Sequence, residues 1–321
     1  MNICFIVAPQ NKDTILDRIA HEIGKSFDNP IYHYGTMDVP KADHYFVTHY
    51  SLLPAIIQQI NPGITPVTAF YTHNKGSLVS YVEAFNLCHS VIAESPEGMK
   101  ELASIGVMQN ILHFVPEGGD NLAFQPHARK ADGAVLICGT NYADGRKNPD
   151  LIRQVMLLLP ERYFYFVGKD WGSITSLDEN GRTTLFNDVE YQTYQAFFKE
   201  CSVYLSCSKL EGGGPNSLIE SMHANLVPVV SDTGNARQYI VDGYNGFIFG
   251  HDATPEQVAE LIEKAYKLAP QDSLPYADVW QSVKNCTWEN YSLNMKEIIT
   301  NDYSKTASQN LNETEYNESD N

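Results

Sequence analysis

The sequence predicts an α/β protein with two doubly wound parallel sheets, and three observations support this. Short apolar runs alternate along the chain with amphipathic stretches, as in repeated βα units. The chain has 321 residues, 43% of them hydrophobic, which is enough for two ordinary cores. A segment without periodicity, rich in Gly, Pro and charge, runs from Pro116 to Gly133 and marks the domain junction.

Each expected strand is a short apolar run, and the stretches between the runs are expected to be helical. In the first half, strands are expected near residues 2–8, 31–35, 44–49, 65–72, 90–94 and 111–115, with helices near 12–26, 51–60, 76–86 and 96–105. In the second half, strands are expected near residues 134–138, 162–167, 202–206, 226–230 and 247–249, with helices near 149–159, 191–200, 216–224, 255–268 and 288–299. Right-handed crossovers then give two parallel sheets.

The expected domains follow from these elements and the junction. The first covers residues 1–127 and the second covers residues 128–300, whose last helix is able to return to the first domain. Residues 301–321 form a polar, acidic tail with almost nothing to bury, so we expect this tail to be disordered.

Composition limits the partners and the compartment. The net charge of -17 excludes nucleic acid as an expected partner, because phosphate backbones are bound by clustered Lys and Arg. The first expected helix mixes both signs of charge, so at most weak peripheral membrane contact is expected. The six cysteines form no CxxC pair and lie in apolar stretches, which favours buried thiols without a disulfide or zinc. The start of the chain lacks a charged n-region and no run is long enough to span a bilayer, so we expect a cytoplasmic protein.

The most informative segment is EGGGPNSLIE at residues 211–220, between two apolar strands. Three consecutive glycines let the backbone come close to a ligand, and Pro215 is a plausible helix start. The first amides of that helix have no internal partner and lie at the positive end of its dipole, which favours a diphosphate. Glu211 and Glu220 flank this anion site and can accept hydrogen bonds from sugar hydroxyls. The alternative is a Gly-rich turn that merely lets the helix pack, with both acids in water.

The segment resembles the donor site of retaining glycosyltransferases of family 4, also called glycosyl transferases group 1. Their pattern is Glu, Gly, any residue, Pro and a helix start that ends in a second Glu; here the turn has one Gly more. The segment from Val115 to Pro126 is similar to the hinge sequence that ends the family's first domain. Further matching segments, in chain order, are SVIAES at 90–95, VLICG at 135–139, FYFVG at 164–168 and TWE at 287–289. The resemblance implies the GT-B fold: two Rossmann-like domains facing each other across a cleft, here with a shortened N-terminal, acceptor-side domain.

The resemblance also implies roles for individual residues. Glu220 is expected to bind the ribose hydroxyls, and Glu211 to contact the transferred sugar as a catalytic residue. The diphosphate is expected to lie against the start of the helix, at Gly213, Gly214, Asn216, Ser217 and Leu218.

Cations for the leaving diphosphate are expected after the strand that ends at Gly139. Lys147 matches the family's lysine, whereas Thr140 stands where the family has an arginine, so we expect Arg146 to supply that charge. The alternative for this segment is a solvated basic turn capped by Asn148.

In the first domain, His73 follows an apolar strand, and the resemblance implies that it contacts the transferred sugar and the leaving phosphate as a catalytic residue. His49, at the end of its own strand, is a rival, and either histidine can be an ordinary strand-end residue. The tyrosines of this domain are candidates for stacking on sugars or, alternatively, for filling the edge of the core.

The expected function is transfer of a sugar, with retention and without a metal or other cofactor, from a UDP- or GDP-linked donor to a glycan or lipid-linked hydroxyl acceptor. A nicotinamide enzyme is a further alternative, which the sequence disfavours because the loop from Ala8 to Lys12 contains no glycine. A non-catalytic protein that binds sugar nucleotides or glycans remains an alternative, as does an epimerase or phosphorylase on the same scaffold.

Overall fold

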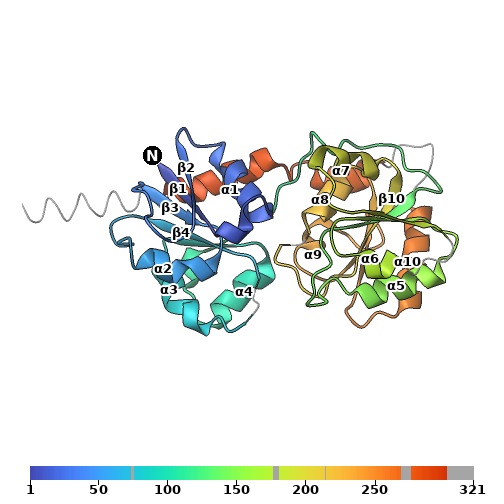
Figure 1. Cartoon of the computed structure of the whole chain (residues 1–321), viewed down its shortest axis with the longest axis horizontal. Coiled ribbons are helices and arrows are strands. Elements are labelled where there is room, and N and C mark those ends of the chain that lie inside the picture. The colour runs from blue at the N-terminus through green and yellow to red at the C-terminus, as the bar shows by residue number, and fades with distance from the viewer. Residues whose placement is uncertain (74–75, 176–180, 214, 269–275, 302–321) are drawn as a thin grey trace, which may run out of the picture. The chain divides into compact units, whose positions relative to one another are not determined.

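The computed structural model describes residues 1–73, 76–175, 181–213, 215–268 and 276–301 (Figure 1). The chain divides into two compact units. The first unit contains Met1–Glu117 and the residues from Trp288 onward, and the second contains Gly118–Thr287. The sequence-based boundaries were instead at residues 127 and 300. Residues 302–321, most of the expected tail, lie outside the described residues.

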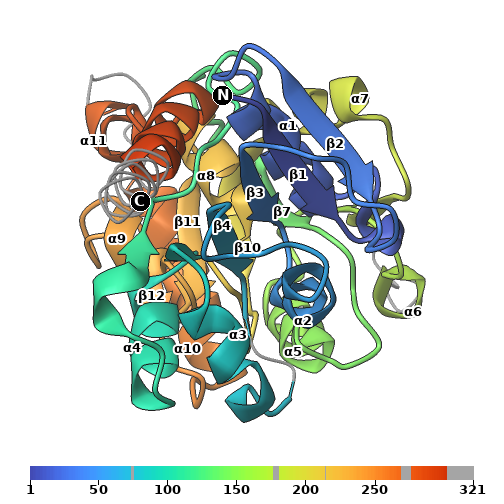
Figure 2. The ribbon, with the colours of Figure 1, turned by 90° about the vertical axis from the view of Figure 1, so that its left-hand side faces the viewer.

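The first unit has a six-stranded parallel sheet in the order β2-β1-β3-β4-β5-β6. Figure 2 shows β2, β1, β3 and β4 side by side. The strands are β1 Ile3–Val7, β2 Pro30–Tyr34, β3 His44–Val47, β4 Val67–Tyr71, β5 Ser90–Ala93 and β6 Leu112–Phe114. The helices with defined bounds are α1 Ile15–Gly24, α2 Leu53–Ile57, α3 Val82–Asn86 and α4 Pro96–Ser104, and a further helix covers residues 288–301.

Strand β1 is buried on both faces, because helices cover each side of the sheet. Phe5 packs in one cluster with Ile23 of α1 and with Met295 of the helix 288–301. Ile6, on the opposite face, packs in another cluster that includes Leu53 of α2. This alternation explains why the strand has an uninterrupted apolar sequence instead of a polar-apolar pattern.

The second unit also has a six-stranded parallel sheet, in the order β12-β11-β10-β7-β8-β9. Its strands are β7 Ala134–Cys138, β8 Phe164–Val167, β9 Thr183–Phe186, β10 Cys201–Ser206, β11 Val227–Ser231 and β12 Phe247–Phe249. Its helices are α5 Pro149–Leu158, α6 Gly172–Thr175, α7 Tyr191–Phe198, α8 Asn216–His223, α9 Ala236–Tyr239, α10 Pro255–Lys267 and α11 Tyr276–Val283. Ile137 faces a cluster with α5 and α10, and Leu136 faces one with α7, α8 and α11.

The structure confirms the predicted α/β fold with two doubly wound parallel sheets and the expected strands. Strand β9 was not predicted from the sequence, because this edge strand is short and only partly buried. Helices α6, α9 and α11 were not predicted either. The predicted ranges of α2 and α3 were too long, because each of these two is a short helix preceded by a 3-10 turn. Within the described part of the chain, every helix is too short or too polar to traverse a bilayer.

Candidate functional site

The strand order of the second unit reverses between β7 and β10. From β7 the chain adds β8 and β9 on one side, and from β10 it adds β11 and β12 on the other. Ligands of doubly wound sheets bind at the carboxyl ends of the strands at such a reversal. The loop that carries Arg146 and Lys147 follows β7, and Glu211 with the start of α8 follows β10. The topology therefore brings the predicted cations and acids of this unit to one sheet edge.

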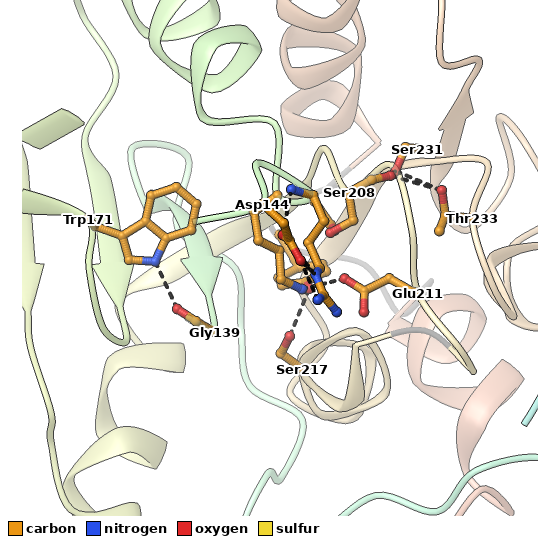
Figure 3. Close-up of polar contacts among 12 residues, drawn as sticks. Gly139, Asp144, Trp171, Ser208, Glu211, Ser217, Ser231 and Thr233 are labelled. Carbon is orange, nitrogen blue, oxygen red and sulfur yellow. Dashed lines mark hydrogen bonds and ion pairs between the residues drawn. The ribbon is translucent and has the colours of Figure 1, made fainter. Parts of the chain in front are cut away.

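Two glycines and a tryptophan hold the ends of β7 and β8 together. Trp171 is fully buried, and its indole Nε1 donates a hydrogen bond to the Gly139 carbonyl at 2.8 Å (Figure 3). Gly168 has a φ of 143°, and a Cβ at this position would lie 2.0 Å from the Gly139 carbonyl oxygen. A side chain would separate the two strand ends, so the glycine of the segment 164–168 allows their close approach.

Lys147 and Glu211 form an ion pair through Nζ and Oε1, with side chains only 10% and 14% exposed (Figure 3). The loops that carry them are also joined by a hydrogen bond of 2.7 Å from the Lys209 amide to the Arg146 carbonyl. The structure therefore brings together the predicted phosphate-binding lysine and the predicted sugar-binding glutamate, which lie far apart in the sequence.

Arg146 is also buried, at 9% exposure, and is paired with a carboxylate of its own loop. Its Nε lies 2.9 Å and its Nη2 lies 2.5 Å from Asp144 Oδ2, and its guanidinium carbon lies 4.5 Å from the Tyr142 ring centroid. The hydrogen bond with Asp144 raises the pKa of Arg146 above its ordinary value. The solvated-turn alternative is wrong, because Arg146 and Lys147 are buried and Asn148 makes no side-chain cap, having instead a left-handed φ of 53°.

The first turn of α8 follows Pro215, which lies at the N-cap position in an extended conformation. The Ser217 hydroxyl is 2.8 Å from the Tyr204 hydroxyl, and the Leu218 amide donates to the Pro215 carbonyl at 2.7 Å. Asn216 reaches back through Nδ2 to the Gly118 carbonyl at 3.4 Å.

Gly213 and Gly214 are the remaining residues of the predicted anion site. Gly213 is buried, and its carbonyl accepts the Asn235 amide at 2.6 Å. Gly214 lies outside the described residues.

Two hydroxyls, one at the end of β11 and one just after it, bind the loop that follows β10. Ser231 Oγ lies 2.5 Å and Thr233 Oγ1 lies 2.9 Å from the Ser208 carbonyl oxygen (Figure 3). These bonds hold the segment between β10 and Glu211 against the neighbouring strand.

Glu220 is 4% exposed and its carboxylate meets two tyrosines of α7. The Tyr194 hydroxyl donates to Oε2 at 3.0 Å. The Tyr191 hydroxyl lies 3.5 Å from Oε1 and 3.1 Å from Asp120 Oδ2. The alternative that places Glu220 in water is therefore wrong. Asp120, Tyr191 and Tyr194 were not predicted as site residues from the sequence, although the spacing of the tyrosines by three places them on one face of a helix.

In the first unit, His73 is half-buried and lies two residues after β4. His49 has a local role: its Nδ1 accepts the Ser51 amide at 3.2 Å, and its ring stacks on Tyr50 with 4.7 Å between centroids. Tyr50 and Tyr71 are buried, which supports the core alternative for these two tyrosines over sugar stacking.

Part of the chain matches the model of a known protein family. Residues 125–274 match the family model described as Glycosyl transferases group 1. No curated protein matches the chain.

Among solved structures, HepE of Anabaena in complex with UDP superposes with a TM-score of 0.77 at 13% identity, covering 94% of this chain and 100% of that chain. Sucrose-phosphate synthase from Thermosynechococcus elongatus has a TM-score of 0.74 at 13% identity, covering 95% and 100%. The lipopolysaccharide outer core galactosyltransferase WaaB in its apo form has a TM-score of 0.70 at 13% identity, covering 94% and 99%. At these identities the superpositions establish the shared GT-B fold. The family match relates residues 125–274, which make up most of the second unit, to the glycosyl transferases group 1.

Proposed function

We propose that the protein transfers a sugar from a nucleoside diphosphate sugar to a hydroxyl of a glycan or lipid-linked acceptor, with retention and without a metal. The observation that carries this proposal is the largely buried ion pair between Lys147 and Glu211, in the loop that leads into α8, the helix that also carries the buried Glu220. It combines a cation for a phosphate with two acids for sugar hydroxyls. HepE was solved with UDP and with UDP-glucose, which favours a UDP-linked donor over a GDP-linked one.

In the ligand-free chain the charges of Lys147 and Glu211 neutralise each other. A diphosphate is the stronger partner for the ammonium group, because it carries more negative charge than one carboxylate. Binding of the donor therefore draws Lys147 to the phosphate and leaves Glu211 free to accept hydrogen bonds from the transferred sugar. Arg146 adds a second positive charge for the leaving group.

The reaction we propose is a front-side displacement. The bond from the anomeric carbon to the diphosphate oxygen breaks, and the bond to the acceptor oxygen forms on the same face. The leaving phosphate oxygen takes the acceptor proton, so the step needs no carboxylate nucleophile, unlike the paired-acid chemistry of glycosidases. On the resemblance alone, we assign His73 of the first unit a contact with the transferred sugar.

We also propose a cytoplasmic location with at most weak peripheral membrane contact. All six cysteines are free and five of them are buried. Free thiols are typical of a reducing compartment.

The test begins with nucleotide binding. UDP or GDP is expected to raise the melting temperature of the wild-type protein, and Glu220→Ala is expected to lose most of this shift because ligand stabilisation requires binding. Glu260→Ala is the matched control: this acid is exposed on α10 and pairs with Lys264. Equal shifts in wild type and Glu220→Ala contradict the ribose assignment.

Turnover then separates transfer from binding. Nucleoside diphosphate is expected to be released from the donor when a glycan acceptor is present, equally with and without a chelator, and the anomeric configuration is expected to be retained. Tight binding without release in any acceptor mixture instead supports the non-catalytic alternative.

A further inference from the structure

The carboxylate of Glu220 is held asymmetrically by α7. Tyr194 donates to Oε2 at 3.0 Å, within the normal range of hydroxyl hydrogen bonds. Tyr191 approaches Oε1 only to 3.5 Å, and its shorter contact is the 3.1 Å one with Asp120. Of the two tyrosines, Tyr194 thus makes the shorter hydrogen bond to the carboxylate and Tyr191 the longer one.

The two tyrosines also differ in how firmly they are fixed. The ring of Tyr194 lies 5.8 Å from that of Phe124 and 5.0 Å from that of Phe198, which packs it into the aromatic part of the core. Burial raises the pKa of Tyr194 well above its ordinary value, so its hydroxyl remains a donor at every physiological pH. Tyr191, on the same face of the helix, is 38% exposed, and its ring lies farther from that of Phe124, at 6.2 Å.

We propose that Tyr194 is a positioning residue that fixes Glu220 for the nucleotide ribose, and that Tyr191 covers the second oxygen until a ribose hydroxyl displaces it. This inference rests on the proposed function, in which Glu220 binds ribose. Displacement of Tyr191 costs little, because its hydroxyl keeps the hydrogen bond to Asp120 when it leaves Glu220. Loss of the Tyr194 hydroxyl instead removes a donor from a buried carboxylate, so Glu220 is held less firmly in the position that binds the ribose.

Two matched substitutions on the same helix test this asymmetry. Each removes one hydroxyl and keeps the ring. Binding is measured by titration calorimetry with UDP and GDP and with their 2′,3′-dideoxy forms, which lack the ribose hydroxyls. Tyr194→Phe is expected to raise the Kd of the natural nucleotide by about 3- to 10-fold, the effect of one ordinary hydrogen bond, and to leave the dideoxy form nearly unchanged. Tyr191→Phe is expected to lower the Kd of the natural nucleotide by about 2-fold, because a competitor for the ribose is removed.

Kinetics and a control complete the experiment. For Tyr194→Phe we expect a higher donor KM with kcat close to wild type, since the role lies in binding and not in the bond-breaking step. Tyr163→Phe is the control, because Tyr163 is 46% exposed before β8 and has no part in the donor site. In the Glu220→Ala background, Tyr194→Phe is expected to have no further effect on nucleotide binding.

The outcomes separate the two levels of inference. A Tyr194→Phe protein with wild-type Kd, or with equal losses for the natural and dideoxy nucleotides, overturns the positioning role. Weaker nucleotide binding by Tyr191→Phe overturns the covering role. Because Tyr191 is 38% exposed, loss of its hydroxyl is not expected to impair folding. If Glu220→Ala binds both nucleotides as the wild type does, the ribose-binding role of Glu220 in the proposed function fails, whatever the two tyrosines do.

Discussion

Single glycines determine how closely backbone segments of the second unit approach one another. Gly168 has a φ in a range that L side chains rarely adopt and touches the Gly139 carbonyl, and Gly119 packs on α8, where a Cβ would lie 2.8 Å from Ile219 Cγ2. Both glycines lie in segments that the sequence related to the family, at 164–168 and 115–126. The structure gives their physical reason, which is close contact with the backbone or with the helix that carries Glu220.

Replacement of Gly168 by alanine is expected to destabilise the second unit by about 3 kcal/mol, because backbone strain and a clash with main-chain atoms add together. The free energy of unfolding in urea measures this loss. Gly172→Ala is the control, since Gly172 begins α6 and a Cβ there meets no atom within 4 Å. A Gly168→Ala protein as stable as the control would contradict the strained geometry.

At the level of elements, α8 gains its position from its surroundings. From Ser217 to His223 it is buried, and its N-cap residue is a proline that provides no side-chain cap. Helix α10 differs, because Thr254 and Gln257 form a complete capping box at its start. The Gln257 amide donates to Thr254 Oγ1 at 3.4 Å, and the Thr254 amide donates to Gln257 Oε1 at 2.8 Å.

Thr254→Ala is therefore expected to cost about 1 kcal/mol of stability in the second unit, the usual effect of losing an N-cap. Thermal unfolding of the variant and the wild type checks the value. The same substitution at Thr14 is a useful comparison, because Thr14 is the N-cap of α1 without a side-chain capping bond, so a smaller loss is expected there. A larger loss at Thr14 would show that capping does not govern the difference.

At the level of the whole molecule, the chain returns to its first unit after completing the second. Trp288 and Met295 of the helix 288–301 lie in the cluster formed by β1 and α1. Ser292 adds a hydrogen bond of 3.1 Å from its hydroxyl to the Ile23 carbonyl. The last described helix is thus part of the core of the first unit, although it follows the second unit in sequence.

Met295→Ala tests this assignment. Met295 is fully buried, so the truncation is expected to destabilise the first unit by about 2–5 kcal/mol, the cost of a large-to-small change in a core. Hydrogen exchange is expected to accelerate in residues 3–7 and to remain unchanged in residues 134–138. Leu293→Ala on the same helix is the control, because Leu293 is 53% exposed. Faster exchange in residues 134–138 instead would show that the helix 288–301 belongs to the core of the second unit, which contradicts this assignment.

Local pattern was sufficient for much of this molecule. Buried parallel strands have continuous apolar sequences and the helices between them are amphipathic, so the strand ranges and the doubly wound class follow from the residues alone. The segment 211–220 likewise predicted a helix start beside two acids after a strand. The edge strand β9 and the four-residue helix α6 were not predicted, because short elements have too few residues to form a clear local pattern.

Tertiary structure alone decided which distant groups meet. Lys147 contacts Glu211 because β7 and β10 are neighbours in the sheet, and that adjacency comes from the crossover that reverses the strand order. Tyr194 reaches Glu220 because α7 and α8 pack on one face of the same sheet. Residue type and spacing indicate which interactions a side chain is able to make. Its actual partner is determined by long-range packing, because packing depends on many weak contacts summed over the whole core.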